Sequence, residues 1–174
     1  MIKKALMAVL ASFGLIAAAT PHANATIQET WTSIAAACTV QGEQLAYVNP
    51  IYGTVSFAAN EAGDFYLTCP VGSINLIPTR MGLTFYNDNG TIGGVNHCFV
   101  TAVLQRASFQ IETGADLVTV SSVGSQTAGH QFFDGPINYQ GQLFGSYYWV
   151  TVQLHRDSAT AACNPVFVGA ILYK

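Results

Sequence analysis

Charged side chains are scarce in this sequence of 174 residues, which holds six Lys or Arg and nine Asp or Glu. Apart from the pair Lys3-Lys4, no two basic residues are neighbours in the chain. Tight binding to a phosphate backbone needs several Lys and Arg close together, and a thinly charged, mildly acidic surface repels polyanions. The composition therefore excludes nucleic acid as a partner.

The short motifs of common catalytic and metal sites are also missing. The chain has no G-x-S-x-G element and no H-E-x-x-H or C-x2-C spacing. Beyond the N-terminal segment the histidines (His97, His130 and His155) stand far apart, so a metal site would have to be assembled from distant segments. The candidate carboxylates are Asp64, Asp88, Glu112, Asp116, Asp134 and Asp157. Three of them (Asp64, Asp88 and Asp134) stand directly beside Gly or Asn, where turn chemistry favours Asp. We predict no catalytic residue, no metal ligand and no cofactor, which leaves a secreted hydrolase as the least favoured function.

The N-terminal residues have the three parts of an export signal. Lys3-Lys4 form a short basic region, residues 5–19 are uncharged and mostly apolar, and Ala23-Asn24-Ala25 supplies the small residues that signal peptidase requires. The apolar run is shorter than the ~20 residues of a spanning helix, and no second such run follows. We predict a signal peptide over residues 1–25, a secreted or periplasmic mature domain over residues 26–174, and no membrane span in that domain.

All four cysteines lie in the mature region, which has the size of a single domain. Removal of residues 1–25 leaves four basic residues against nine acidic ones, a net charge of −5, and no linker or repeat divides the remainder. An even number of cysteines in an oxidising compartment predicts two disulfides rather than metal ligation. Four cysteines allow three connectivities, and the sequence does not choose among them; our working expectation is Cys38–Cys69 with Cys98–Cys163.

Alternation of apolar and polar residues with period 2 recurs along the chain, and long helical periodicity does not. The clearest predicted strands cover residues 65–69, 81–85, 97–105, 148–154 and 166–173, and weaker ones cover residues 45–57, 108–112, 117–122 and 131–133. Turn formers separate them, the best being the hairpin signal at residues 87–90. Residues 32–37 form either a helical turn or a flexible lead-in. Short strands at this spacing predict an all-β fold, an antiparallel, jelly-roll-like β-sandwich.

One predicted strand carries a set of side chains suited to binding sugars. The strand ending at Arg156 turns its even-numbered apolar residues inward, which leaves five others on the opposite face: Tyr147, Trp149, Thr151, Gln153 and His155. An aromatic ring beside amide and hydroxyl groups can stack on a sugar and pair with its hydroxyls. Tyr147, Trp149, Gln153 and His155 are the predicted ligand-binding residues. The alternative is that this face is covered, with Trp149 packed away, because strands favour aromatic residues for packing alone.

Several motifs stand in order along the mature chain: Cys38, Tyr52-Gly53, Asn60, Thr68-Cys69-Pro70-Val71, Phe85-Tyr86-Asn87-Asp88, His97-Cys98-Phe99-Val100, Gly129 and Tyr147-Tyr148-Trp149-Val150. In this order they resemble a diffuse group of uncharacterised small secreted bacterial proteins. The resemblance covers most of the mature chain and implies secretion and a β-sandwich, but no mechanism. The chain differs from the group's pattern over residues 113–129 and in the position of Cys163, which leaves the disulfide pairing open.

A second set of motifs is similar to pilin-like and spore-coat-U-like secreted subunits. It comprises Ala37-Cys38-Thr39-Val40, Thr68-Cys69 and the last strand, ending at Tyr173. That resemblance implies polymerisation by donation of an N-terminal strand to a neighbour's sheet, although residues 26–37 lack a clear alternating donor pattern. The favoured function is a non-catalytic domain that binds polysaccharide or cell-surface material, and the alternative is a structural subunit of a fibre or coat.

Overall fold

A computed structural model describes residues 28–41, 46–72, 77–87, 98–108, 111–125, 128–138, 146–158 and 163–174. The predicted signal peptide, residues 88–90 of the predicted turn at residues 87–90, and His97 lie outside these residues. The described part contains one 3₁₀ turn, η1 (Ala35–Ala37), and eleven strands: β1 (Glu29–Ile34), β2 (Thr39–Gln41), β3 (Ala46–Asn49), β4 (Thr54–Phe57), β5 (Gly63–Val71), β6 (Arg80–Asn87), β7 (Cys98–Ser108), β8 (Ile111–Ser121), β9 (Gly129–Pro136), β10 (Ser146–Arg156) and β11 (Pro165–Tyr173).

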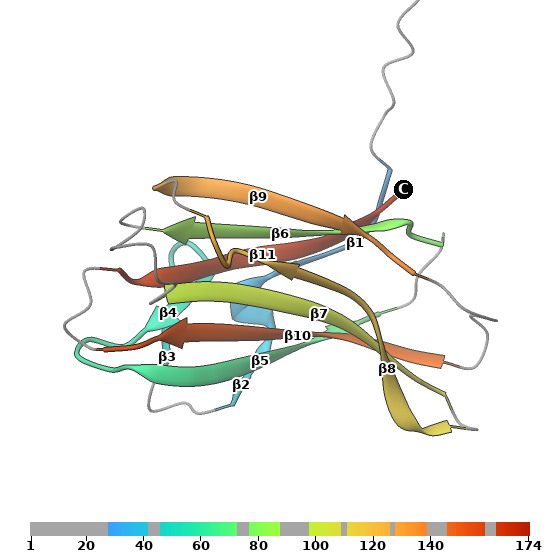
Figure 1. Ribbon diagram of the computed structural model, residues 1–174, viewed down its shortest axis with the longest axis horizontal. Coiled ribbons are helices and arrows are strands. Elements are labelled where there is room, and N and C mark those ends of the chain that lie inside the picture. The colour runs from blue at the N-terminus through green and yellow to red at the C-terminus, as the bar shows by residue number, and fades with distance from the viewer. Residues whose placement is uncertain are drawn as a thin grey trace, which may run out of the picture.

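The strands form two antiparallel sheets (Figure 1). The first sheet has the order β3-β4-β11-β6-β9, with β1 also paired to β11, and the second has the order β2-β5-β10-β7-β8. Pairing is nested along the chain, since β7 pairs with β8, β6 with β9, β5 with β10 and β4 with β11. This winding of a long antiparallel hairpin into two sheets is the jelly roll. The predicted fold class is confirmed.

β10 is the central strand of the second sheet and shows how the pattern builds the core. It pairs along its length with β5 on one side and β7 on the other. Val150, Val152 and Leu154 point inward and are fully buried, while the residues between them are partly exposed. The first sheet supplies the other half of the core, and the largest fully buried side chains from both are Phe65, Leu67, Met81, Leu83, Phe85, Leu104, Leu154, Phe167 and Leu172. Burying these apolar surfaces is the main force that holds the two sheets together.

Two disulfides join segments that are distant in the sequence. Cys38, directly before β2, is bonded to Cys69 in β5, and Cys98, the first residue of β7, is bonded to Cys163, just before β11. The expected pairing is confirmed.

The segment before Cys38 corrects the prediction of a helical turn or flexible lead-in at residues 32–37. Residues 29–34 form β1, which pairs with β11 from Glu29↔Tyr173 to Ile34↔Gly169, and only Ala35–Ala37 form a helical turn. The alternation of apolar and polar residues is weak in this segment because β1 buries little of its own surface. Backbone hydrogen bonds hold it to β11 and extend to the mutual pair of Gln28 and Lys174, and Trp31 packs against the core.

The weaker predicted strands have different bounds in the structure. The stretch predicted at residues 45–57 is two strands, β3 and β4, with a turn between them, and residues 111–121 form one strand where two were expected. Within the described ranges, no helix has the length and apolar character needed to cross a membrane.

The loop that each disulfide closes leads to a stability prediction. The bonds span 31 and 65 residues of sequence. Replacing either pair by serine should lower the free energy of unfolding by about 2–4 kcal/mol, because the unfolded chain regains the loop freedom that the bond removes. Urea unfolding of Cys98→Ser/Cys163→Ser and Cys38→Ser/Cys69→Ser, compared with the oxidised wild type, measures the loss. Equal unfolding midpoints and slopes in all three proteins would contradict the prediction.

Candidate functional site

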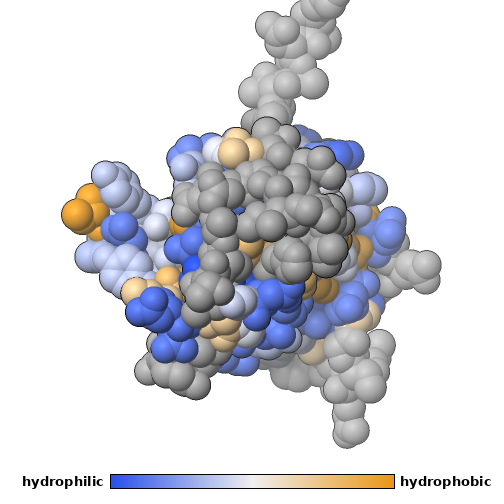
Figure 2. Space-filling view, turned by 60° about the vertical axis from the view of Figure 1, so that its left-hand side comes forward, coloured by the Kyte–Doolittle hydropathy of each residue, from blue (hydrophilic) through white to orange (hydrophobic). Residues whose placement is uncertain are grey.

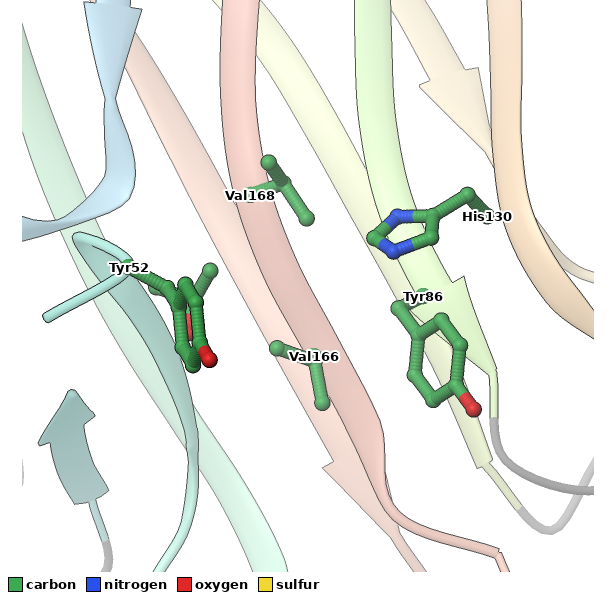
Figure 3. Close-up of a pocket in the computed structure, with 6 residues that line it drawn as sticks. Tyr52, Tyr86, His130, Val166 and Val168 are labelled. Carbon is green, nitrogen blue, oxygen red and sulfur yellow. The ribbon is translucent and has the colours of Figure 1, made fainter.

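An open groove lies on the outer face of the first sheet, over β4, β11, β6 and β9. It has a volume of about 420 Å³ and is lined by Tyr52, Thr54, Tyr86, His130, Val166 and Val168. Figure 3 shows the two valines on β11 in the middle, Tyr52 on one side, and Tyr86 with His130 on the other. The groove is therefore an aliphatic floor between two aromatic walls.

A β-bulge in β11 shapes the floor. Phe167 is paired with Phe85 and Gly169 with Thr84, so Val168 is the extra residue of the bulge. Bulges of this kind redirect a side chain at a binding site. Here Val168 points into the groove with Val166. At the same place β11 changes its neighbour from β4 to β1.

One wall consists of two rings from neighbouring strands, tilted against each other. Tyr86 of β6 and His130 of β9 are directly opposite each other in the sheet register. Their ring centroids lie 4.9 Å apart with an interplanar angle of 58°. The two rings hold each other in place, as cross-strand aromatic pairs do.

The other wall is Tyr52, which a tight turn between β3 and β4 presents. The side-chain oxygen of Asn49 accepts hydrogen bonds from the backbone amides of Ile51 and Tyr52, at 3.0 and 3.2 Å. Gly53 follows with a φ of 65°, and its carbonyl accepts a hydrogen bond from the amide of Ala36 at 2.9 Å. A side chain other than hydrogen is disfavoured at this φ. The backbone under Tyr52 is thus fixed, while its ring is 75% exposed.

None of these groove residues was predicted from the sequence to belong to a site. Tyr86 belongs to the outward-facing set of β6, which follows once Met81, Leu83 and Phe85 are taken as inward-facing. Period-2 alternation therefore predicts that Tyr86 lies on the outer face of the sheet. His130 and Tyr52 could not be placed beside it, because the sequence does not give the pairing of β6 with β9 or the path of the β3–β4 turn.

The predicted residues of β10 lie together on the outer face of the second sheet. Tyr147 is 61% exposed, and Trp149, Gln153 and His155 are partly buried. The indole N–H of Trp149 donates to Gln105 Oε1 at 2.8 Å, and the hydroxyl of Thr151 donates to the same oxygen at 2.7 Å. Trp149 is therefore neither packed away nor free to rotate.

The polar groups at the far end of this face are bonded to one another. Gln153 Nε2 donates to Asp64 Oδ1 at 2.8 Å. The ring nitrogens of His155 lie 2.8 Å from Asp64 Oδ1 and 2.5 Å from Asp157 Oδ1, and the ring stacks on Phe99 with centroids 4.6 Å apart. Burial alone would lower the pKa of His155, but the hydrogen bonds to both carboxylates outweigh it and raise the pKa above its ordinary value of 6.5.

The two faces differ in what their polar groups offer to a ligand. On the β10 face, the polar atoms of Trp149, Gln153 and His155 already have partners. In the groove, the hydroxyls of Tyr52 and Tyr86 and the ring nitrogens of His130 form no hydrogen bond with another described residue. A ligand can therefore use the groove's polar groups without displacing an existing contact.

No cluster of three or more His, Cys, Asp or Glu able to hold a metal occurs in the part of the chain that the structure describes. The described residues that line the groove include no carboxylate. The groove therefore offers stacking and hydrogen bonding to a ligand.

Comparison with known proteins does not assign the chain to a family. No protein-family model and no curated protein matches the sequence. Among solved structures, a family two carbohydrate esterase from Cellvibrio japonicus is similar with a TM-score of 0.42 and 11% identity over 82% of this chain, which spans only 33% of the esterase chain.

Two carbohydrate-binding modules are similar at the same level. The module CBM36, solved with calcium and xylotriose, has a TM-score of 0.43 and 12% identity over 83% of this chain and 99% of its own. The xylan-binding module CBM86 from Roseburia intestinalis has a TM-score of 0.42 and 16% identity over 83% of this chain and 95% of its own. Likeness at this level concerns the general shape, so the ligand of this chain has to follow from its own side chains.

The raised pKa of His155 predicts a pH-dependent contribution to stability. The protonated ring stabilises the folded protein fully below about pH 6.5, the pKa in the unfolded chain, and this contribution is lost as pH rises through the higher pKa of the folded state. The difference in unfolding free energy between wild type and His155→Gln should therefore be largest between about pH 5 and pH 6.5 and shrink above that range.

Urea unfolding of both proteins across this pH range provides the measurement. Thr151→Val, on the same face and without a titratable group, serves as the control variant. A wild-type advantage over His155→Gln that is constant with pH would contradict the prediction.

Proposed function

We propose that this protein is a non-catalytic carbohydrate-binding domain and that the groove between Tyr52 and the Tyr86–His130 pair is its principal binding site. One observation supports the proposal above all: two aromatic walls stand over an aliphatic floor, and their polar ends have no partner among the described residues. A pyranose presents C–H faces that stack on aromatic rings and hydroxyls that need hydrogen-bond partners.

The chemistry of the lining favours a neutral sugar. Tyr52, Tyr86 and Thr54 supply hydroxyls that both donate and accept, and His130 supplies ring nitrogens. Among the described residues that line the groove there is no Lys or Arg to bind a carboxylate or sulfate group of an acidic sugar. On the side of the molecule in Figure 2, the coloured surface is mostly blue or pale, with orange in small separate patches. Such a surface suits a hydrated polymer better than a large apolar partner.

The face of β10 remains a second proposed surface for the same class of ligand. This face carries aromatic rings and polar groups that can contact a sugar, on Tyr147, Trp149, Gln153 and His155. Tyr147 is exposed. The fixed position of Trp149 supports stacking, since a ring that is already held loses little freedom on binding.

The proposal includes an extracytoplasmic location. Two disulfides suit an oxidising compartment, and the signal peptide over residues 1–25 would bring the chain there. Membership of the diffuse group of small secreted bacterial proteins is part of the same proposal.

A fibre or coat subunit is the alternative function. Polymerisation by strand donation would need β1 to leave the edge of β11 and to be replaced by a strand from another molecule. In the structure this edge is filled by β1 of the same chain. Elution of the purified protein as a polymer from a sizing column would favour the alternative.

Loss of binding in groove variants tests the proposal. We expect Tyr52→Ala and Tyr86→Ala each to weaken binding to the best ligand from a panel of soluble polysaccharides by at least about tenfold, or ~1.4 kcal/mol, because each removes one wall. Affinity electrophoresis followed by isothermal titration provides the measurement, and unfolding midpoints check that the variants are folded.

Trp149→Ala distinguishes the two surfaces. If the groove is the principal site, this variant binds within a factor of about two of wild type, well under 1 kcal/mol. Loss in Trp149→Ala with normal binding in both tyrosine variants would move the site to the β10 face. Absence of wild-type binding to every polysaccharide and to insoluble cell-wall material would refute the function itself.

A further inference from the structure

The outward-facing side chains of β9 continue from the groove along the same face of the sheet. His130 is in the groove wall, Phe132 follows two residues later, and Asp134 two residues after that, all three on the exposed side of the strand. Residues two apart on a strand lie about 7 Å from each other. The three side chains therefore form a row that starts at the groove wall and continues beyond the groove along β9.

The ring of Phe132 reaches over Gly82 of β6, where no side chain occupies the space. A Cβ atom at Gly82 of β6 would overlap the Cε2 and Cζ atoms of the Phe132 ring and would lie 2.9 Å from Cγ2 of Ile171 in β11. The ring thus leans from β9 over Gly82 towards β11, and 51% of Phe132 remains exposed. An exposed aromatic ring at this position can stack on the C–H face of a sugar.

A polar network lies beyond Phe132. Asp134 accepts hydrogen bonds from Arg80 Nε, at 2.5 Å, and from the hydroxyl of Tyr173. These bonds, that from Arg80 first, hold the pKa of Asp134 below its ordinary value, so the carboxylate stays ionised. The terminal amino groups of Arg80 bond to no other described residue. They are donors, and the second carboxylate oxygen of Asp134 is an acceptor, within the same ion pair.

We infer that the ligand is a linear glycan chain lying along β6 and β9, with Phe132 as a second stacking platform and Arg80 and Asp134 as polar contacts beyond it. This inference rests on the proposed function of the groove and adds the polymeric nature of the ligand. From Tyr86 to Arg80 the track is about 20 Å long, at about 3.3 Å per residue. That length exceeds a single sugar ring.

The sequence of contacts matches the repeating chemistry of a glycan. Each sugar unit offers an apolar face and a rim of hydroxyls, and the track offers an aromatic wall, an aromatic platform and a charged hydrogen-bonding pair in succession. A peptide added as an extra strand would instead need the backbone edge of β9 and would not need a platform on the outer face. The position of Phe132 over Gly82 therefore favours the glycan.

Binding of β-1,4-linked gluco-, xylo- and galacto-oligosaccharides, from the disaccharide to the hexasaccharide, tests the inference by isothermal titration. Wild-type affinity should rise with length by about tenfold or more, which is ~1.4 kcal/mol. Phe132→Ala should keep the disaccharide affinity of wild type and lose most of that rise. Tyr86→Ala should weaken binding at every length. Val123→Ala, which alters a side chain about as exposed (50%) on the turn after β8, should behave as wild type.

Gly82→Ala is a second way to remove the platform, because its methyl group displaces the Phe132 ring while the phenylalanine remains. It should reproduce the lost length dependence of Phe132→Ala wherever its unfolding midpoint shows that it is folded. Equal affinities of wild type and Phe132→Ala at every length would overturn the inference while leaving the groove intact. Failure of wild type to bind any of the oligosaccharides or polysaccharides would overturn the proposed function as well, so the two failures are distinguishable.

Discussion

The alternation of buried and exposed residues along β10 and β11 is the constraint on which the rest of this structure depends. Each strand lies between two partners in its sheet and supplies fully buried residues, such as Val152 and Leu172, to the core. Because successive side chains point to opposite faces, the same strands present their remaining side chains to the outside. The same alternation therefore determines both the core and the proposed binding surfaces. A shift of register by one residue would exchange the inward and outward side chains and destroy both.

The groove arises where this regularity is interrupted. One extra residue in β11, Val168, breaks the alternation, and at that point the strand loses β4 and gains β1 as its neighbour. The close approach of β1 requires Gly169, since a Cβ atom there would lie 2.6 Å from the carbonyl oxygen of Ser33. The turn carrying Tyr52 is anchored to the same junction through the hydrogen bond from Ala36 to Gly53. The bulge that brings Val168 to the groove floor therefore lies at the junction to which the Tyr52 turn is also anchored.

The sequence predicted the layers of the fold and much less of the site. Alternation in β5, β6, β10 and β11 was strong enough to identify strands and their inward faces, and the even number of cysteines predicted two disulfides. The outward set of β10 was also placed on the correct face. Gln153 and His155 form hydrogen bonds with Asp64 because β10 is paired with β5. The alternation of apolar and polar residues does not show which strands are paired, so these bonds could not be predicted. Likewise, the meeting of Tyr52, Tyr86 and His130 needs contacts between segments far apart in the chain, and a bulge leaves no clear mark in hydrophobic periodicity.

The nested strand pairing has a consequence for the order in which the molecule folds. β7 and β8 adjoin in the sequence, so closing their hairpin loses little chain entropy, whereas β4 and β11 come from near opposite ends of the described chain. We therefore expect the hairpin to form early and the ladder between β4 and β11 to form late. The groove is built on that last ladder, so the ability to bind a ligand there would arise only in the final step of folding and would distinguish the native chain from collapsed intermediates.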